Sequence, residues 1–219
     1  YAATDGEPLL IPKDIHKDQT YFLHTLDQKQ LSNVIFPLSN ITKDEVKKIA
    51  KNIGFKSYNK KESMGICFIG NKKFKNFINK YIENNPGEIV DTSGKVIGKH
   101  NGMFYTTIGQ REGIGIGGMK NTKNLPWYVY KKDLNKNILY VCQGNENTLL
   151  YKTKIYIRDI HVITNNEKDV LEKKLLCQVR HLGDKYECVI SKEKENLFCV
   201  NSKEKIRAPA PGQSLVFFE

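Results

Sequence analysis

The periodicity of the sequence changes near Gly87, and this change constrains the fold more than any other feature. Before it, apolar residues recur at helical spacing, and after it short β-rich runs alternate with turn residues. A length of 219 residues accommodates one large domain or about two to three small ones. We therefore expect domain boundaries near residues 85 and 150.

Three helices are predicted in the part before Gly87. Two begin with a capping box, in which the N-cap residue and the residue three positions later exchange side-chain and backbone hydrogen bonds. The pairs are Asp27 with Gln30 and Thr42 with Glu45. One face of the second helix carries Val46, Ile49, Ala50 and Ile53. Gly54 is placed to end this helix, and the third helix runs from about Asn71 to the turn residues 84–87.

The part after Gly87 is predicted to form two hairpins and five further strands, because short apolar runs are separated by turn residues. The hairpins join 89–90 to 96–97 and 127–130 to 138–141. The later strands are 154–163, 174–180, 186–191, 196–200 and 214–218. Such closely spaced strands indicate a small barrel or sandwich.

The charge balance favours a polyanionic partner. The chain has 35 lysines and arginines against 24 acidic residues, a net charge of +11. Only four of the basic residues are arginine, so a coding bias toward lysine is an alternative source of the excess. Residues 43–80 have the highest density of positive charge, with eleven lysines against three acidic residues.

No apolar run approaches the roughly 18 to 20 residues of a membrane span, so a membrane protein is not expected.

Five cysteines without a CxxC pair argue against a zinc site or a disulfide framework, and they fit a reducing cytoplasm. Four lie in or beside β patterns and are predicted to be small core residues: Cys142, Cys177, Cys188 and Cys199. The fifth, Cys67, lies between apolar residues and is flanked by Gly65 and Gly70. It is either a buried strand cysteine or a thiol on a movable segment, where Lys60 and Lys61 would favour the reactive thiolate.

The glycine-rich stretch 109–118 has the composition of a phosphate-binding loop. It lacks a following helix and the GK[ST] ending of a nucleotide loop, so a tight β connection explains it better. Arg111 on this stretch could still meet a phosphate.

Two more segments carry residues suited to nucleic acid. Lys17, Asp18 and Gln19 can together reach sugar, phosphate and base edges. The alternative is a solvated helix start with Asp18 as its N-cap. Near the C-terminus, Arg180, which adjoins His181, and Gln213 can also read nucleic acid. The alternative is that Arg180 pairs with Asp184 or Glu187.

Several stretches together resemble one family, the tRNA-specific 2-thiouridylases of the MnmA/TrmU type. They follow the family's order along essentially the whole chain: KDQTYFL (17–23), FPLSNITKDEVKKIA (36–50), KKESMGICFIG (60–70), PGEIVDTSGKVIGKHNGMFYTTIGQREGIGIGG (86–118), PWYV (126–129) and PGQSLVFF (211–218). GICFIG and TIGQREGIGIGG are specific to the family.

The resemblance implies a fold of three parts. Residues 1–84 would be the α/β tail of a PP-loop domain, of the adenine nucleotide alpha hydrolase-like kind, with a loop bearing a persulfide cysteine. Residues 85–150 would form a small β-rich central domain. Residues 151–219 would form a C-terminal β-barrel that stops short of the family's last strand.

The resemblance also implies a cytoplasmic tRNA-uridine 2-sulfurtransferase. In the family, ATP adenylates C2 of the wobble uridine, and a cysteine persulfide then delivers the sulfur that replaces its oxygen. The implied partners are tRNA and a sulfur-donor or relay protein, with no metal and no membrane. Cys67 matches the persulfide-bearing cysteine. The residues that match tRNA contacts are Lys17, Asp18, Gln19, Arg180, His181 and Gln213, although His181 replaces a common aromatic residue and the loop around 180–188 is shorter than usual.

The sequence also departs from the family pattern. It contains neither the SGGxDS phosphate loop nor the family's second, nucleophilic cysteine, which can pair with the persulfide cysteine in a disulfide. We therefore expect the C-terminal part of the enzyme, inactive alone, with the ATP site outside this chain. One alternative is a non-catalytic tRNA- or RNA-binding β-barrel module in which Cys67 is structural. Another is a basic scaffold whose charge reflects coding bias.

Overall fold

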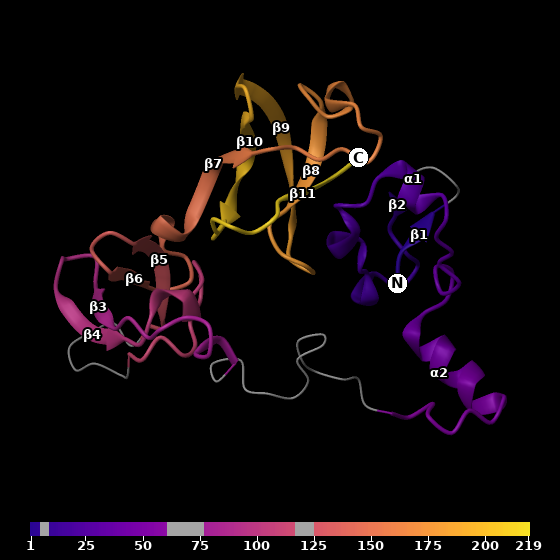
Figure 1. Ribbon diagram of the computed structural model, residues 1–219, viewed down its shortest axis with the longest axis horizontal. Coiled ribbons are helices and arrows are strands. Elements are labelled where there is room, and N and C mark those ends of the chain that lie inside the picture. The colour runs from indigo at the N-terminus through magenta and orange to yellow at the C-terminus, as the bar shows by residue number, and fades with distance from the viewer. Residues whose placement is uncertain (5–8, 61–76, 117–124) are drawn as a thin grey trace. The chain divides into compact units, whose positions relative to one another are not determined.

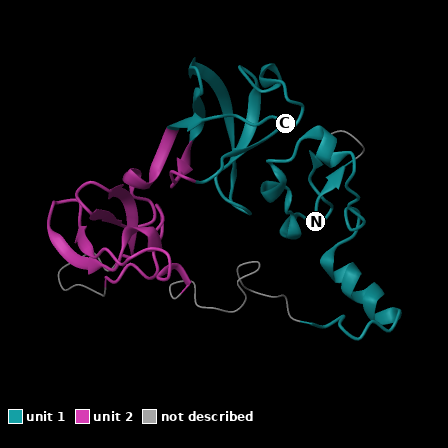
Figure 2. Cartoon of the chain, in the orientation of Figure 1, with its two compact units in different colours: residues 1–62, 154–204, 213–219 teal, residues 63–153, 205–212 magenta. Residues whose placement is uncertain are grey.

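A computed structural model describes residues 1–4, 9–60, 77–116 and 125–219. The chain divides into two compact units, each made of separate sequence segments (Figure 2). Unit 1 comprises Tyr1–Glu62, Lys154–Glu204 and Gln213–Glu219, and unit 2 comprises Ser63–Thr153 and Lys205–Gly212. The sequence-based boundaries near 85 and 150 stay predictions.

The first two predicted helices are confirmed, and so are their capping boxes. Helix α1 spans Gln28–Leu31 and helix α2 spans Lys43–Asn52 (Figure 1). In α2 the Glu45 amide donates to the Thr42 hydroxyl at 3.2 Å, and the Thr42 amide donates to the Glu45 carboxylate at 2.6 Å. Each such cap stabilises a helix by about 1 kcal/mol. Gly54 follows α2 with a φ of 75°, the left-handed conformation that glycine adopts easily at a helix end.

The third predicted helix lies mostly outside the described residues. Its described end contains the backbone hydrogen bond from Ile82 to Ile78 at 3.0 Å. The Phe77 and Tyr81 rings lie 5.2 Å apart, as expected for side chains four residues apart on a helix. The sequence patterns did not identify the antiparallel pair β1 (Ala3–Thr4) and β2 (Leu9–Leu10), whose strands are too short to show alternation.

Unit 2 is built on a four-stranded sheet with the order β4-β3-β6-β5. Both predicted hairpins are confirmed: β3 (Gly87–Val90) with β4 (Val96–His100), and β5 (Trp127–Asp133) with β6 (Ile138–Gln143). Strands β3 and β6 pair in parallel, which joins the two hairpins. Alternation along the strands buries a different cluster on each face. One contains Ile89, Ile114, Val129, Leu139 and Val141, and the other contains Tyr128, Cys142 and Leu150.

The described part of the glycine-rich stretch is a β connection. Gly109, Gly113 and Gly115 have φ values of 82°, 73° and 83°, a region open to glycine at no steric cost. The Gly109 amide donates to the Val129 carbonyl at 2.7 Å, and the Gln110 side chain holds the turn through the Thr107 amide at 2.9 Å. The glycines therefore serve backbone geometry, as the missing GK[ST] ending predicted.

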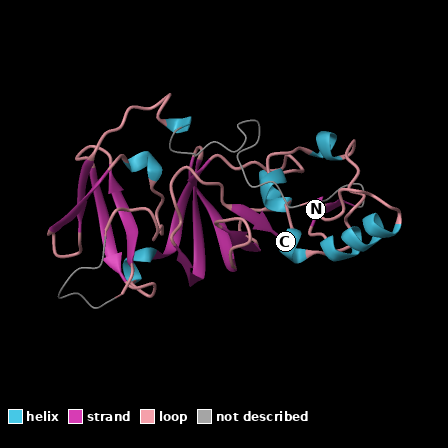
Figure 3. Ribbon diagram, turned by 90° about the horizontal axis from the view of Figure 1, so that it is seen from below, coloured by secondary structure: helices cyan, strands magenta, loops and turns pink. Residues whose placement is uncertain are grey.

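The second sheet contains all five strands predicted after residue 150, in the order β11-β8-β9-β10-β7. Their bounds are β7 Tyr151–Arg158, β8 Lys174–Gln178, β9 Lys185–Lys194, β10 Leu197–Arg207 and β11 Val216–Phe218 (Figures 1 and 3). The prediction ended β10 too early, because its second half includes a polar, exposed stretch at residues 203–205. Among the described pairings β11 and β7 are the sheet edges, so closure into a barrel stays a prediction.

The four cysteines predicted to be core residues are buried and free: Cys142, Cys177, Cys188 and Cys199. Burial raises the pKa of the Cys142 thiol to about 11, because a low-dielectric environment disfavours the thiolate. These thiols therefore act as small apolar side chains, as the β pattern predicted.

Candidate nucleic-acid interface

The N-terminal segment of unit 1 is fastened to its sheet at Asp18. The Nε2 atom of His181 lies 2.6 Å from the main-chain oxygen of Asp18. Asp18 lies between two 3-10 helices, Ile15–Lys17 and Thr20–Leu23, whereas His181 follows β8. The bond thus joins two of the segments predicted to contact tRNA, across 163 positions of sequence.

Tyr21 connects the third predicted segment, which contains Gln213, to the same junction. Its hydroxyl donates to the Ser214 carbonyl at 2.8 Å and lies 3.4 Å from the Val179 carbonyl. Ser214 directly follows Gln213, and Val179 directly precedes Arg180. The pKa of Tyr21 is raised because partial burial disfavours the phenolate, although the positive charge of Arg180 acts in the opposite direction.

Aromatic rings cover the junction. The Phe22 and His181 ring centroids lie 4.5 Å apart, and Tyr21 lies 6.2 Å from His181. Phe22 is nonetheless 59% exposed. An exposed ring beside basic residues is the arrangement on which unpaired bases stack in RNA-binding proteins.

Two of the predicted contact residues also have local structural roles. The Asp18 carboxylate accepts the Thr20 amide at 2.9 Å and the Thr20 hydroxyl at 2.6 Å. The Gln19 amide donates to the Tyr1 carbonyl at 2.8 Å, and its side-chain oxygen accepts from the Tyr1 main-chain nitrogen. The expected helix start is thus a 3-10 turn that Asp18 stabilises, and the Gln19 side chain holds the N-terminal strand.

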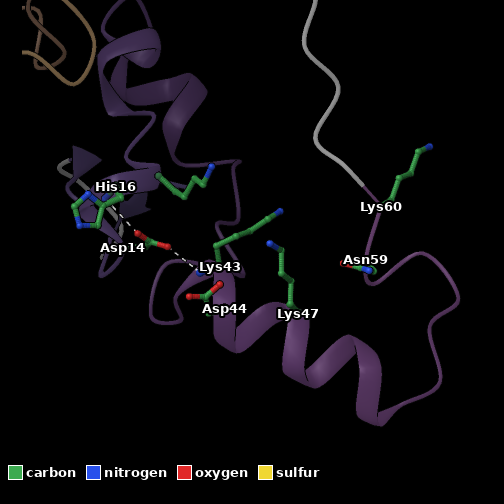
Figure 4. Close-up of a pocket in the computed structure, with 8 residues that line it drawn as sticks. Asp14, His16, Lys43, Asp44, Lys47, Asn59 and Lys60 are labelled. Carbon is green, nitrogen blue, oxygen red and sulfur yellow. Dashed lines mark hydrogen bonds between the residues drawn. The ribbon is translucent and has the colours of Figure 1, made fainter.

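Lys17 lines a basic pocket instead. The pocket has a volume of about 480 Å³ and lies at the first turns of α2 (Figure 4). Its lining contains four lysines and two carboxylates: Asp14, His16, Lys17, Lys43, Asp44, Lys47, Asn59 and Lys60. The buried Asp14 carboxylate accepts the Lys43 amide at 2.8 Å and the His16 amide at 3.2 Å. Asp14 thereby ties the first 3-10 turn to the start of α2.

The N-terminus of α2 carries a second fixed carboxylate. Glu45 accepts the Thr42 amide and both its oxygens lie 3.1 Å from the Lys13 ammonium. The Thr42 backbone bond, followed by the Lys13 bond, lowers the pKa of Glu45 from 4.5 to about 2. Glu45 is therefore ionised throughout the physiological range.

The structure thus brings five of the predicted RNA-contact residues, or their immediate neighbours, to one junction and places Lys17 at the pocket. Cys67, the predicted persulfide residue, lies outside the described residues. The sequence patterns did not single out Tyr21 and Phe22, although both belong to the KDQTYFL stretch, nor the individual pocket lysines on α2. The signal for those lysines was their spacing of four residues on a capped helix.

The described part of the chain shows neither a cluster of metal ligands nor a membrane-spanning helix. No group of three or more histidine, cysteine, aspartate and glutamate side chains there is arranged to hold a metal ion. No described helix combines the length and apolar character that crossing a bilayer requires.

Family models identify the class of the chain as a HUP domain followed by two β domains. The model described as tRNA methyl transferase HUP domain matches residues 2–71. The tRNA methyl transferase PRC-barrel domain matches 75–143, and the aminomethyltransferase beta-barrel domain matches 152–219.

Comparison with curated relatives identifies one family within this class. The tRNA-specific 2-thiouridylase MnmA of Legionella pneumophila (strain Paris) is 42% identical over 207 residues, which are 94% of this chain and 57% of the relative. The proteins of the same name from Alcanivorax borkumensis and Coxiella burnetii are 41% and 42% identical, over 99% and 96% of this chain and 59% and 58% of their own lengths. The chain belongs to the MnmA/TrmU family. It spans somewhat more than half the length of these relatives.

Proposed function

We propose that the protein containing this chain is a tRNA-uridine 2-sulfurtransferase that replaces the C2 oxygen of the wobble uridine with sulfur. The observation that carries the proposal is the junction at Asp18 and His181. Three segments far apart in the sequence, each matching a tRNA contact of the family, are held together there by the bonds of His181 and Tyr21. The names of the relatives, tRNA-specific 2-thiouridylase, support the same reaction.

The proposal assigns a role to each part of the chain. Residues 1–84 form the C-terminal part of the PP-loop domain, residues 85–150 the central domain and residues 151–219 a β-barrel. ATP activates the uridine in the part of the enzyme that carries the phosphate loop, a motif that this sequence lacks. The enzyme works in the cytoplasm and receives sulfur from a donor or relay protein.

Cys67 carries the persulfide sulfur in this proposal. Support comes from the match of GICFIG to the family and from the surrounding charge, because residues 43–80 hold eleven lysines against three acidic residues. Positive charge favours an anionic thiolate or persulfide. The other four cysteines are buried in the two sheets, which leaves Cys67 as the candidate for sulfur chemistry.

Mass spectrometry of tRNA nucleosides tests the function. The complete protein, supplied with ATP, unmodified tRNA and a persulfide donor, is expected to produce 2-thiouridine, and its Cys67→Ser variant to bind tRNA without producing it. Residues 1–219 alone are expected to produce none. A methylated nucleoside, in line with the names of two family models, would overturn the proposal, as would normal thiolation by the Cys67→Ser variant.

A second candidate is a non-catalytic RNA-binding module, and the junction favours it as well, since its contacts do not involve Cys67. This candidate predicts tRNA binding by the complete protein with no thiolation under any sulfur supply. It also predicts that Cys67 reacts with thiol reagents no faster than the buried cysteines.

A further inference from the structure

We infer that the pocket at the start of α2 binds a phosphate of the RNA backbone, with Lys43, Lys47 and Lys60 as its cationic side chains. The inference rests on the proposed tRNA substrate. It extends the contact surface beyond the residues that match the family's tRNA contacts, of which Lys17 alone lines this pocket.

The pocket concentrates positive charge on a fixed scaffold. Lys43 and Lys47 lie four residues apart on α2 and leave it on the same side, while Lys60 comes from the segment after the helix (Figure 4). The capping box and the Asp14 bond hold the start of the helix, so the two helical lysines project from an ordered turn.

One of the two acidic side chains of the pocket, Asp14, is already bonded to the backbone. Both Asp14 oxygens face main-chain amides, of Lys43 and His16, and Asp14 is buried. Its carboxylate occupies the helix N-terminus, so an incoming anion meets the lysine ammonium groups instead. Counting all lining residues, four lysines stand against two carboxylates.

The chemistry of the pocket and its place in the chain point to a backbone phosphate. Lysine offers a point charge with three donors, which suits phosphate contacts that carry no sequence information. Lys17 adjoins Asp18 of the junction, and Lys60 precedes Cys67 by seven positions of sequence. A phosphate held here would lie on an RNA strand that also contacts the junction.

The test compares two double variants of the complete protein in tRNA binding at several salt concentrations. Lys43→Gln with Lys47→Gln removes two pocket lysines, and Lys48→Gln with Lys51→Gln removes two exposed lysines of the same helix outside the pocket lining. Each lost phosphate contact reduces the slope of log affinity against log salt by about 0.7 to 0.9. Because the two lysines face a single phosphate, we expect the pocket variant to lose about 0.7 to 0.9 in slope, and roughly five- to eightfold in affinity at about 0.1 M salt.

The control variant is expected to keep the slope of the unmodified protein. Equal losses in both variants would show diffuse attraction and overturn the inference, and so would an unchanged pocket variant. The circular dichroism of the variants must keep its helical signal, so that a reduced salt slope can be attributed to the lost charge and not to unfolding.

If the unmodified protein thiolates tRNA while the pocket variant binds tRNA normally, the inference alone fails. If the unmodified protein does not bind tRNA, both proposals fail.

Discussion

The Nε2 atom of His181 and the main-chain oxygen of Asp18 lie 2.6 Å apart. A carbonyl oxygen only accepts hydrogen bonds, so Nε2 carries the proton in this arrangement. Neutral imidazole has a tautomer that supplies this proton, and protonation of the ring retains it. The bond therefore does not need a charged histidine, and it serves as a positional link between the turn after β8 and the segment that contains Lys17.

Replacing His181 with alanine tests that link. The variant is expected to lose about 1 kcal/mol of local stability and to weaken tRNA binding, because the turn no longer fixes the Asp18 segment. His161→Ala is the matched control, since His161 Nε2 lies 3.0 Å from the Leu26 carbonyl in the same unit. Hydrogen exchange and tRNA affinity are measured for both. Comparable affinity losses in the two variants would mean that His181 has no special place in RNA binding.

Removing the hydroxyl of Tyr21 separates packing from hydrogen bonding at the same junction. Tyr21→Phe keeps the ring near His181 and removes the bond to the Ser214 carbonyl. The expected cost is about 0.5 to 1.5 kcal/mol, toward the lower end because Ser214 is exposed and water can replace the hydroxyl. Amide exchange of residues 17–23 should accelerate correspondingly. Tyr156→Phe, at an exposed tyrosine, should leave the amide exchange of residues 17–23 unaltered. If Tyr21→Phe exchanges these amides as slowly as the unmodified chain, the hydrogen bond does not have the role assigned to it.

Local patterns predicted the helices, hairpins and buried cysteines because each depends on neighbours in sequence. The capping pair Thr42 and Glu45 lies within one turn, and the alternation along β6 records its two buried faces. The junction could not be predicted in this way. The bond between His181 and Asp18 depends on how the chain returns after 163 positions, and no periodicity encodes it. The family resemblance grouped these residues without giving their contacts.

Strand ends were predicted less well than strand existence. The second half of β10 contains Lys203, Glu204 and Lys205, which are exposed, so their polarity concealed the continuing strand. Strand β8 ends before Arg180, where the chain turns and the Gly183 amide donates to the Arg180 carbonyl at 2.9 Å. Leu182 in this turn has a φ of 56°, and a leucine in the sequence does not predict this left-handed conformation.

Thiol labelling of the folded protein separates Cys67 from the core cysteines. The exposed fractions of Cys142, Cys177, Cys188 and Cys199 are 0%, 0%, 3% and 1%, and the raised pKa of Cys142, about 11, leaves little thiolate at neutral pH. We expect one rapidly labelled cysteine at about pH 7.5, which peptide mapping assigns to Cys67, and no rapid labelling in Cys67→Ser. Equal rates for all five under native conditions would remove the support for Cys67 as the sulfur carrier.

Acid should weaken the start of helix α2 through Glu45. Its pKa falls from 4.5 to about 2 on folding, so its stabilising effect is complete above the unfolded value and is lost as the pH falls from 4.5 to about 2. In Glu45→Gln the amide oxygen can still accept the Thr42 amide, but the charge that faces Lys13 is gone. The ¹³Cα shifts of α2, followed across this pH range, should lose helicity in the unmodified chain and much less in the variant. Asp44→Asn removes a charge from the same turn outside the capping box and should retain the acid-dependent loss. Identical pH profiles for the unmodified chain and Glu45→Gln would show that the capping carboxylate does not govern the acid response of α2.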